Sequence, residues 1–88
     1  MVSKKITVMN EEGLHIRPAG VLCKEALKFE SKVHIVFDNK DANAKSVLNV
    51  LSARVKKGDE VELICEGVDE QEALRYLTQL IEDKFDIE

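Results

Sequence analysis

Hydrophobic residues recur along the chain with two different spacings, and these spacings predict strands and helices in turn. Alternating apolar and polar positions predict short strands at residues 6–9, 33–37, 41–44 and 60–66. Apolar positions three and four apart predict helices that begin near Pro18, Ser46 and Asp69. Glycine and Asx-rich segments separate the elements, at residues 10–13, 38–40, 58 and 67–69.

The predicted helices have recognisable starts and one apolar stripe each. Pro18 suits a first turn, where a missing N–H costs nothing, and Ser46 and Asp69 are good N-caps. The second helix is expected to run through Arg54, with Val47, Val50 and Leu51 along one side. The stripes of the other two helices are Ala19, Leu22, Cys23, Ala26 and Leu27, and Ala73, Leu74, Leu77, Ile81 and Phe85.

The order of elements is β-α-β-β-α-β-α. Strands with one apolar face and helices with one apolar stripe predict an antiparallel sheet covered on one side. We therefore expect residues 1–88 to form a single α+β domain, an open-faced two-layer sandwich of four antiparallel strands with three helices on one face. Such folds have many functions, so the architecture alone does not assign one.

Composition excludes several classes of function. The 88 residues carry 13 Lys and Arg against 17 Asp and Glu, a net charge of −4. That balance and four aromatic residues argue against direct nucleic-acid binding, which needs a basic surface and stacking platforms. No signal-peptide pattern and no spanning apolar run are present, so we expect a cytoplasmic protein without membrane insertion. Cys23 and Cys65 are expected to be reduced core residues.

Charge is unevenly distributed along the chain. Residues 1–28 and 29–58 carry +2 and +3, whereas residues 59–88, with two basic and eleven acidic side chains, carry −9. One interpretation of this distribution is that the folded protein has a positive face, which binds partners, and a negative face. The other is that the acidic residues form a solvated C-terminal helix that has no partner. Charge alone does not choose between them.

The segment from Gly13 to Ala19, with the sequence GLHIRPA, carries the candidate chemistry. His15 immediately precedes a helix, next to backbone N–H groups that have no partner within that helix. Those amides and the helix dipole favour an anion, so a phosphoryl group on the imidazole would meet donors at once. Arg17 offers a guanidinium suited to phosphate in the same turn. A lone histidine before a helix is more often an ordinary capping or surface residue.

Two separated motifs change that balance, because the sequence resembles the HPr family of histidine-containing phosphocarrier proteins of the bacterial phosphoenolpyruvate-dependent sugar phosphotransferase system. The first motif is residues 13–19, and the second is residues 43–52, NAKSVLNVLS. The segment 67–74 is also similar to the family. The resemblance covers essentially the whole chain and implies an HPr-like fold.

The resemblance implies a role for each motif residue. His15 would take a phosphoryl group on Nδ1 from phosphorylated enzyme I and pass it to an EIIA domain of a sugar permease, with Arg17 steadying the group. Such a protein is a carrier, without a cofactor or metal, and not an enzyme in the strict sense, since each turnover consumes a partner's phosphoryl group. We expect a monomer. Ser46 would be a regulatory site for an HPr kinase/phosphorylase, with a catabolite-control repressor as a further partner.

The apolar residues around the two motifs form the predicted docking surface. A helix of barely two turns has too many hydrophobic residues to bury all of them, so Leu48 is expected to stay exposed with Val47 or Leu51. The resemblance adds Ile16, Gly20 and Lys24 to the same rim. Ile16 and Asn49 depart from the residues common in the family, and their effect on partner choice stays open.

Two other functions remain open at this point. One is a regulatory or nitrogen-type HPr paralogue whose phosphoryl transfer signals rather than feeds transport. His15 argues against the Crh type, which lacks the active-site histidine, and Lys45-Ser46 weighs modestly against the nitrogen type. The other is a binding domain without phosphoryl chemistry. That domain would show no change of mass after incubation with phosphoenolpyruvate and enzyme I.

Overall fold

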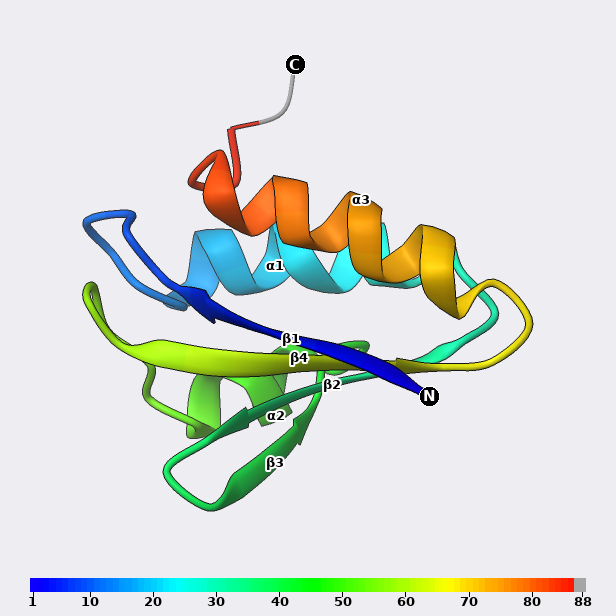
Figure 1. Ribbon diagram of the computed structural model, residues 1–88. Coiled ribbons are helices and arrows are strands. Elements are labelled where there is room, and N and C mark those ends of the chain that lie inside the picture. Colours follow the sequence, from blue (N-terminus) through cyan, green and yellow to red (C-terminus); the bar gives the residue numbers. More distant parts are fainter. Residues whose placement is uncertain (87–88) are drawn as a thin grey trace.

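Four strands and three helices follow one another in the predicted order in a computed structural model, which describes residues 1–86 (Figure 1). The strands are β1 (Val2–Thr7), β2 (Lys32–Phe37), β3 (Lys40–Asn43) and β4 (Glu60–Glu66). The helices are α1 (Ile16–Ala26), α2 (Val47–Ser52) and α3 (Glu70–Glu82).

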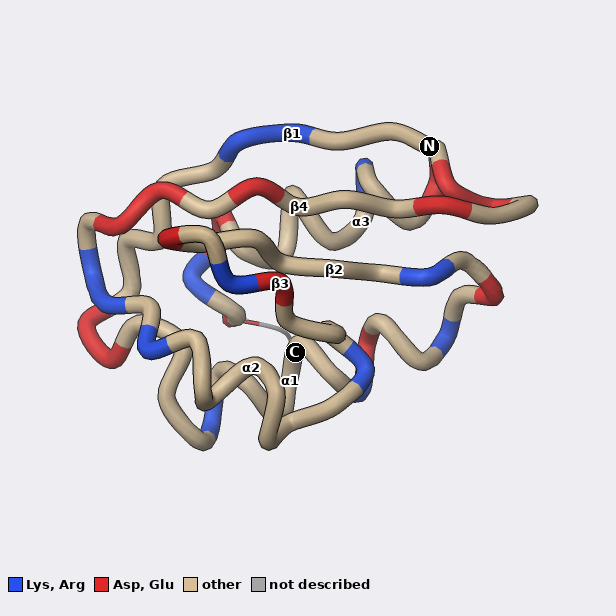
Figure 2. Tube along the Cα trace, turned by 90° about the horizontal axis from the view of Figure 1, so that it is seen from below, with Lys and Arg blue, Asp and Glu red and all other residues tan. Residues whose placement is uncertain are grey.

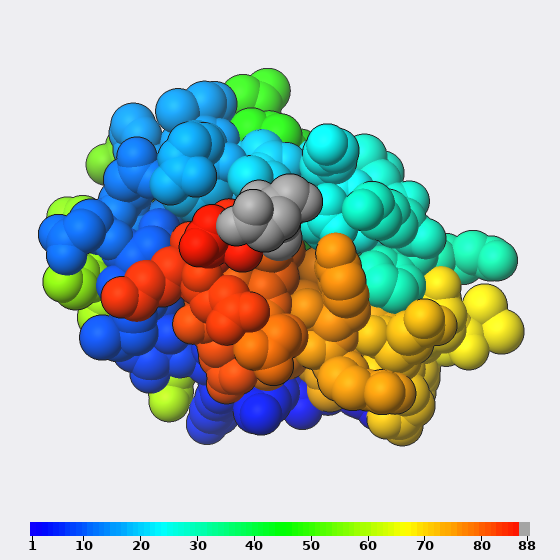
Figure 3. All heavy atoms as spheres, turned by 90° about the horizontal axis from the view of Figure 1, so that it is seen from above, coloured from blue at the N-terminus to red at the C-terminus, as the bar shows by residue number. Residues whose placement is uncertain are grey.

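The strands form one antiparallel sheet in the order β1-β4-β2-β3. Helices α1 and α3 lie side by side across one face of this sheet, and α2 lies next to α1 and β3 (Figures 1 and 3). The predicted α+β open-faced sandwich is therefore confirmed. Among residues 1–86, no helix has the length and apolar composition required to cross a bilayer.

The core lies between the sheet and its helices because the strands alternate as the sequence predicts. Val33 and Ile35 of β2 face Cys65 and Leu63 of β4 in register, and all four side chains are buried. Apolar side chains of the two long helices close the core from the other side: Ala19, Leu22 and Ala26 from α1, and Ala73, Leu77 and Ile81 from α3.

The opposite face of the sheet carries charged residues. Glu62 of β4 is the register partner of Lys5 on β1, and Glu66 is the partner of Lys32 on β2. Figure 2 shows acidic positions of β4 next to basic positions of β1. Acidic residues of the C-terminal third therefore lie beside lysines of the neighbouring strands. The side chain of His34 on β2 contacts that of Asp41, diagonally across on β3, with Nδ1 and Oδ1 2.6 Å apart.

Several predicted boundaries are wrong. Strand β1 lies at 2–7 rather than 6–9, although Val8 is buried and its amide donates to the Asp59 carbonyl at 2.9 Å. Helix α1 begins at Ile16, two residues before Pro18. Helix α2 ends at Ser52 rather than at Arg54, because Arg54 adopts a left-handed backbone with φ of 58°.

Two predicted roles, the burial of Leu27 and the cap at Asp69, are also wrong, and the role predicted for Phe85 is confirmed only in part. Leu27 follows the last turn of α1 and is 60% exposed. The Asp69 carboxylate does not cap α3; it accepts hydrogen bonds from the amides of Glu30 and Ser31, both at 2.9 Å, and from the Ser31 hydroxyl. Phe85 is buried, but it lies beyond the end of α3 in a left-handed turn.

The two cysteines are both free thiols, but only one lies fully in the core. Cys65 is buried, and burial raises the pKa of its thiol to about 11. Cys23 is half-buried, and its Sγ donates to the carbonyl oxygen of Lys45 at 3.2 Å. That contact joins α1 to the residue just before Ser46.

Candidate functional site

The loop before α1 is packed tightly against the segment that follows α2. Gly13 has a left-handed φ of 61°, and a Cβ atom there would lie 2.5 Å from the carbonyl oxygen of Val55. The amide of Leu14 donates to the same oxygen at 3.0 Å, and Asn10 Nδ2 donates to the Gly13 carbonyl at 2.6 Å. Only glycine allows this approach, and the approach fixes the position of the next residues, including His15.

His15 is the N-cap residue of α1, with an extended backbone at φ −83° and ψ −170° and an exposed side chain. No side chain caps the helix, and the first backbone bond runs from the Ala19 amide to the His15 carbonyl at 2.8 Å. Pro18 has no N–H. Within residues 1–86, the amides of Ile16 and Arg17 therefore lack a protein partner. Free donors at the positive end of a helix dipole favour an anion, and here they lie next to His15 in the chain.

Arg17 lies in the same turn, but its guanidinium is already paired. Nη2 donates to Glu12 Oε1 at 2.8 Å, and both side chains are largely exposed. A neighbouring pair joins Lys57 Nζ to Glu11 Oε2 at 2.6 Å, and this hydrogen bond holds the pKa of the Glu11 carboxyl below its usual value. Two ion pairs of the same kind thus flank the loop that carries His15.

A hollow of about 480 Å³ adjoins His15. It is lined by Glu12, Leu14, His15, Leu51, Arg54, Val55 and Lys56. Glu12, Arg54 and Lys56 were not predicted as residues of this site. Residues 54–56 lie next to His15 only because two loops that are distant in the sequence pack together. Glycine is the usual residue in a left-handed position just after a helix, so an arginine there is unusual. The sequence shows this departure at Arg54 only to a reader who already knows that α2 ends at Ser52.

Ser46 is the N-cap of α2, as predicted. Its Oγ accepts hydrogen bonds from the amide and from Nδ2 of Asn49, both at 3.3 Å. The side chain is half-buried at the start of a helix that contains no charged residue. Lys45, just before it, is linked to the segment that follows α1, because its Nζ donates to the Phe29 carbonyl oxygen at 2.7 Å.

The residues predicted for partner docking form an apolar surface on α1 and α2. Leu48 is 77% exposed and Ile16 is 58% exposed, whereas Val50 of the same short helix is buried. The rest of the predicted set comprises half-buried Val47 and Leu51 on α2, and half-buried Gly20 and exposed Lys24 on α1. The exposure predicted for Leu48 is present, and the binding roles of these residues stay predictions.

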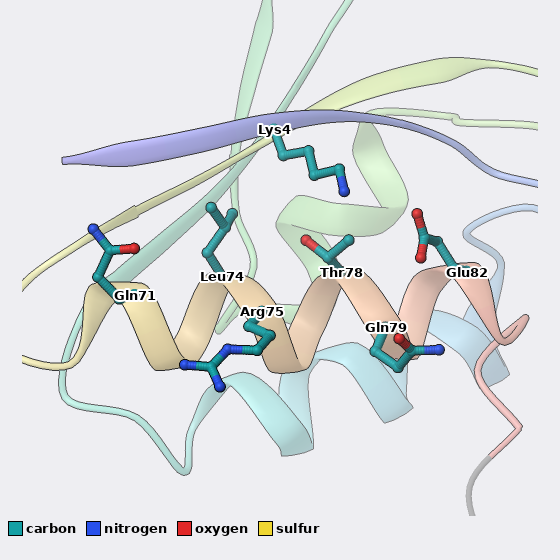
Figure 4. A pocket seen from close by; sticks show the side chains of 7 residues that line it. All are labelled: Lys4, Gln71, Leu74, Arg75, Thr78, Gln79 and Glu82. Atoms are coloured by element: carbon teal, nitrogen blue, oxygen red, sulfur yellow. The ribbon is translucent and has the colours of Figure 1, made fainter.

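A second hollow, of about 340 Å³, lies between β1 and α3 and contains none of the predicted site residues (Figure 4). Lys4 reaches over α3 toward Thr78 and Glu82, and the buried Thr78 hydroxyl has no partner within residues 1–86. Nowhere in the described residues 1–86 do three His, Cys, Asp or Glu side chains lie close enough together to hold a metal ion.

Comparison with known proteins places the chain in a family. A family model described as the PTS HPr component phosphorylation site matches residues 2–83. The chain belongs to the HPr family. The resemblance stated from the motifs is confirmed, and the chain is a member of the phosphocarrier family of the phosphotransferase system.

The similarity to individual members extends over nearly the full chain. The phosphocarrier protein HPr of Treponema pallidum is 40% identical, with 100% of both chains covered. A crystal structure of HPr from Thermoanaerobacter tengcongensis has a TM-score of 0.95 and 43% identity, covering 100% of this chain and 99% of that one. Crh of Bacillus subtilis, solved as a domain-swapped dimer, has a TM-score of 0.77 and 42% identity, covering 96% and 97%.

Proposed function

We propose that this HPr-family member carries a phosphoryl group on His15, accepting it from phosphorylated enzyme I and donating it to EIIA domains of sugar permeases. The observation that supports this proposal most directly is the uncapped start of α1. His15 is exposed there, and the amides of Ile16 and Arg17 have no protein partner in the described chain. An uncapped helix start beside an exposed imidazole suits a site that gains and loses an anion.

The transfer needs no external acid or base when the His15 imidazole is neutral and the donor's phosphohistidine ring carries a proton on its other nitrogen; the positive charge of the ring then passes from the donor to His15. The Nδ1 lone pair of His15 attacks phosphorus while the P–N bond to the donor histidine breaks and returns its electron pair to that ring. Each ring keeps its single N–H, so no proton is gained or lost. The free amides and Arg17 neutralise charge on the transferred oxygens, and positioning does most of the work.

Intact mass spectrometry after incubation with enzyme I and phosphoenolpyruvate tests this proposal. The expected result is an acid-labile adduct of one phosphoryl group, absent from His15→Ala and present in His34→Ala, the variant of the only other histidine. A subsequent loss of the adduct on addition of an EIIA domain supports a role in transport. Phosphorylation without transfer to any EIIA supports the regulatory paralogue.

Ser46 is proposed as a regulatory site for an HPr kinase/phosphorylase, with a catabolite-control repressor as the reader of the phosphoserine. A phosphate at the N-cap of α2 suits the helix dipole, so its effect is expected on partners rather than on the fold. Ser46→Asp adds a charge and keeps a cap, and Ser46→Asn keeps the cap alone. We expect slower phosphoryl acceptance from enzyme I in Ser46→Asp and unchanged acceptance in Ser46→Asn.

The remaining expectations follow from these partners. A cytoplasmic monomer fits a carrier that shuttles between enzyme I and permeases. Because the related Crh structure is a swapped dimer, the monomer stays a prediction. Light scattering at several protein concentrations tests it, and a dimer mass at low concentration would contradict it.

A further inference from the structure

The geometry points to Arg54 as a second cation for the phosphoryl group on His15. This inference deepens the proposed function and rests on His15 as the phosphorylated residue. Arg54 follows α2, lines the hollow next to His15, and has an exposed side chain. The chain thus brings an arginine from the α2–β4 loop to the histidine, in addition to the one in the GLHIRPA motif.

The backbone of Arg54 is the first observation that supports this role. Its φ of 58° is left-handed, at the position just after a helix where glycine is usually found. An arginine pays a steric penalty there that a glycine avoids. Strained positions of this kind gather at functional sites, where the side chain serves a purpose that offsets the strain. Gly58, the next glycine along the chain, shows that this loop uses glycine at another positive φ, of 94°.

The pairing of the nearby charges is the second observation. Arg17 donates to Glu12 at 2.8 Å and must leave it, or share it, to bind phosphoryl oxygens. The Arg54 guanidinium forms no hydrogen bond or ion pair within residues 1–86. An unpaired guanidinium is available to an arriving anion without breaking an existing contact. Arg54 is therefore the cation better prepared to meet the phosphoryl group first.

The chemistry of the group is the third reason. A phosphoryl group on a histidine nitrogen carries up to two negative charges, spread over three oxygens. The two free amides at the start of α1 can serve some of those oxygens from the helix side. The hollow next to His15 is lined in addition by Arg54 and Lys56. A guanidinium there supplies directed donors for the remaining oxygens.

The test combines enzyme I kinetics with a measurement that needs no partner protein. Arg54→Ala and Arg54→Gly remove the cation, and Arg54→Lys keeps its charge. The control, Arg75→Ala, removes an exposed arginine of α3 that does not line the hollow beside His15. We expect kcat for phosphoryl acceptance to fall about tenfold in the first two, the size of one charge-assisted hydrogen bond. Arg54→Lys should recover part of the rate, and Arg75→Ala should match the parent protein.

Chemical phosphorylation gives the partner-free readout. Phosphoramidate transfers its phosphoryl group to the imidazole as the P–N bond to ammonia breaks, and a His34→Gln background restricts the product to His15. The phosphoryl pKa, followed by ³¹P NMR, should rise in Arg54→Ala and Arg54→Gly and stay unchanged in Arg75→Ala, because a neighbouring cation favours the dianion.

Each result has a distinct meaning. An unchanged phosphoryl pKa in both Arg54 variants overturns the inference, whatever enzyme I does. A higher KM with unchanged kcat also overturns it, since Arg54 would then contact the partner and not the phosphoryl group. Failure of enzyme I to phosphorylate the parent protein contradicts the proposed function alone. Urea unfolding of Arg54→Gly separates these effects from misfolding, because removal of the strained side chain should make that variant more stable.

Discussion

Glu12 binds the guanidinium of Arg17 at 2.8 Å, one turn of chain from the imidazole of His15. The Glu12 carboxylate therefore competes with an incoming phosphoryl group for Arg17. It also places a negative charge near His15, the residue that is proposed to accept that group. We predict that Glu12→Gln accepts the phosphoryl group from enzyme I faster, by up to about fivefold, the range expected for an exposed ion pair. Single-turnover transfer at low and high salt measures the change, which should shrink as salt screens the charges.

The neighbouring residue supplies a matched control. Glu11 forms an exposed ion pair of 2.6 Å with Lys57 but does not line the hollow beside His15. Glu11→Gln makes the same change of net charge one residue away. Equal acceleration in both variants would show that overall charge, and not competition for Arg17, sets the rate.

Two glycines near His15 should respond to alanine in opposite directions. At Gly13 a Cβ would meet the Val55 carbonyl oxygen at 2.5 Å on a backbone with φ of 61°, whereas at Gly20 a Cβ would meet nothing within 4 Å. We predict that Gly13→Ala lowers the free energy of unfolding by about 2 kcal/mol or more, from left-handed strain and the clash. Gly20→Ala should raise it by about 0.5–1 kcal/mol, the helix-propensity gain.

Urea denaturation measures both glycine variants, and phosphoryl transfer adds a second result. Gly13→Ala should also slow transfer, because the loop that positions His15 is displaced. If Gly20 lies in the docking surface, Gly20→Ala will raise KM for enzyme I despite its greater stability. Unchanged stability in Gly13→Ala would mean that the loop tolerates displacement, and the account of how His15 is positioned would be wrong.

The fold was predictable because each helix and strand buries one side, which fixes the spacing at which apolar residues recur along it. Val33 and Ile35 flank polar His34, and Val61 and Leu63 flank polar Glu62, whereas the apolar residues of α1 and α3 recur at helical spacing. Element type and sheet face therefore follow from the pattern. The ends of elements depend on contacts that the pattern does not contain. Asp69 has the composition of an N-cap, but the Ser31 loop, brought close by the fold, binds its carboxylate instead.

The candidate site was predictable to the same extent. His15 could be placed at a helix start because the features that place it, Gly13 and Pro18, are local. Glu12 was visible in the sequence, but its pairing with Arg17 depends on side-chain geometry. Arg54 was assigned to a helix that in fact ends before it, and its approach to His15 depends on the contact between Leu14 and Val55.

A buried carboxylate between α1 and α3 should make stability depend on pH. Glu25 is 2% exposed and accepts hydrogen bonds from Lys28 Nζ at 2.8 Å and from the Tyr76 hydroxyl at 2.6 Å. These bonds, with Lys28 the larger cause, hold the pKa of Glu25 below its ordinary value of 4.5. The stabilisation is therefore complete above that value and is lost as the pH falls through the lower pKa of the folded protein.

Unfolding of the parent protein and of Tyr76→Phe from about pH 7 to about pH 3 measures this dependence. Tyr76→Phe removes one bond to the carboxylate and keeps a ring against Phe29, whose centroid lies 5.7 Å away. We expect a loss of about 1.5 kcal/mol at neutral pH, the lower end of the range for a hydrogen bond to a charged group. The difference between the two proteins should narrow in acid. A difference that stays constant with pH would assign the loss to packing instead of to the charged hydrogen bond.

Leu48 should contribute to partner binding without contributing to stability. It is 77% exposed on α2, and Val68, at 85%, is an equally exposed apolar residue in the turn before α3, outside the predicted docking surface. We predict that Leu48→Ser leaves the urea midpoint unchanged and raises KM for enzyme I by about fivefold or more, as loss of a central apolar contact does. Val68→Ser should change neither quantity. A KM that responds to Val68 and not to Leu48 would move the docking surface to the other end of the molecule and disconnect it from His15.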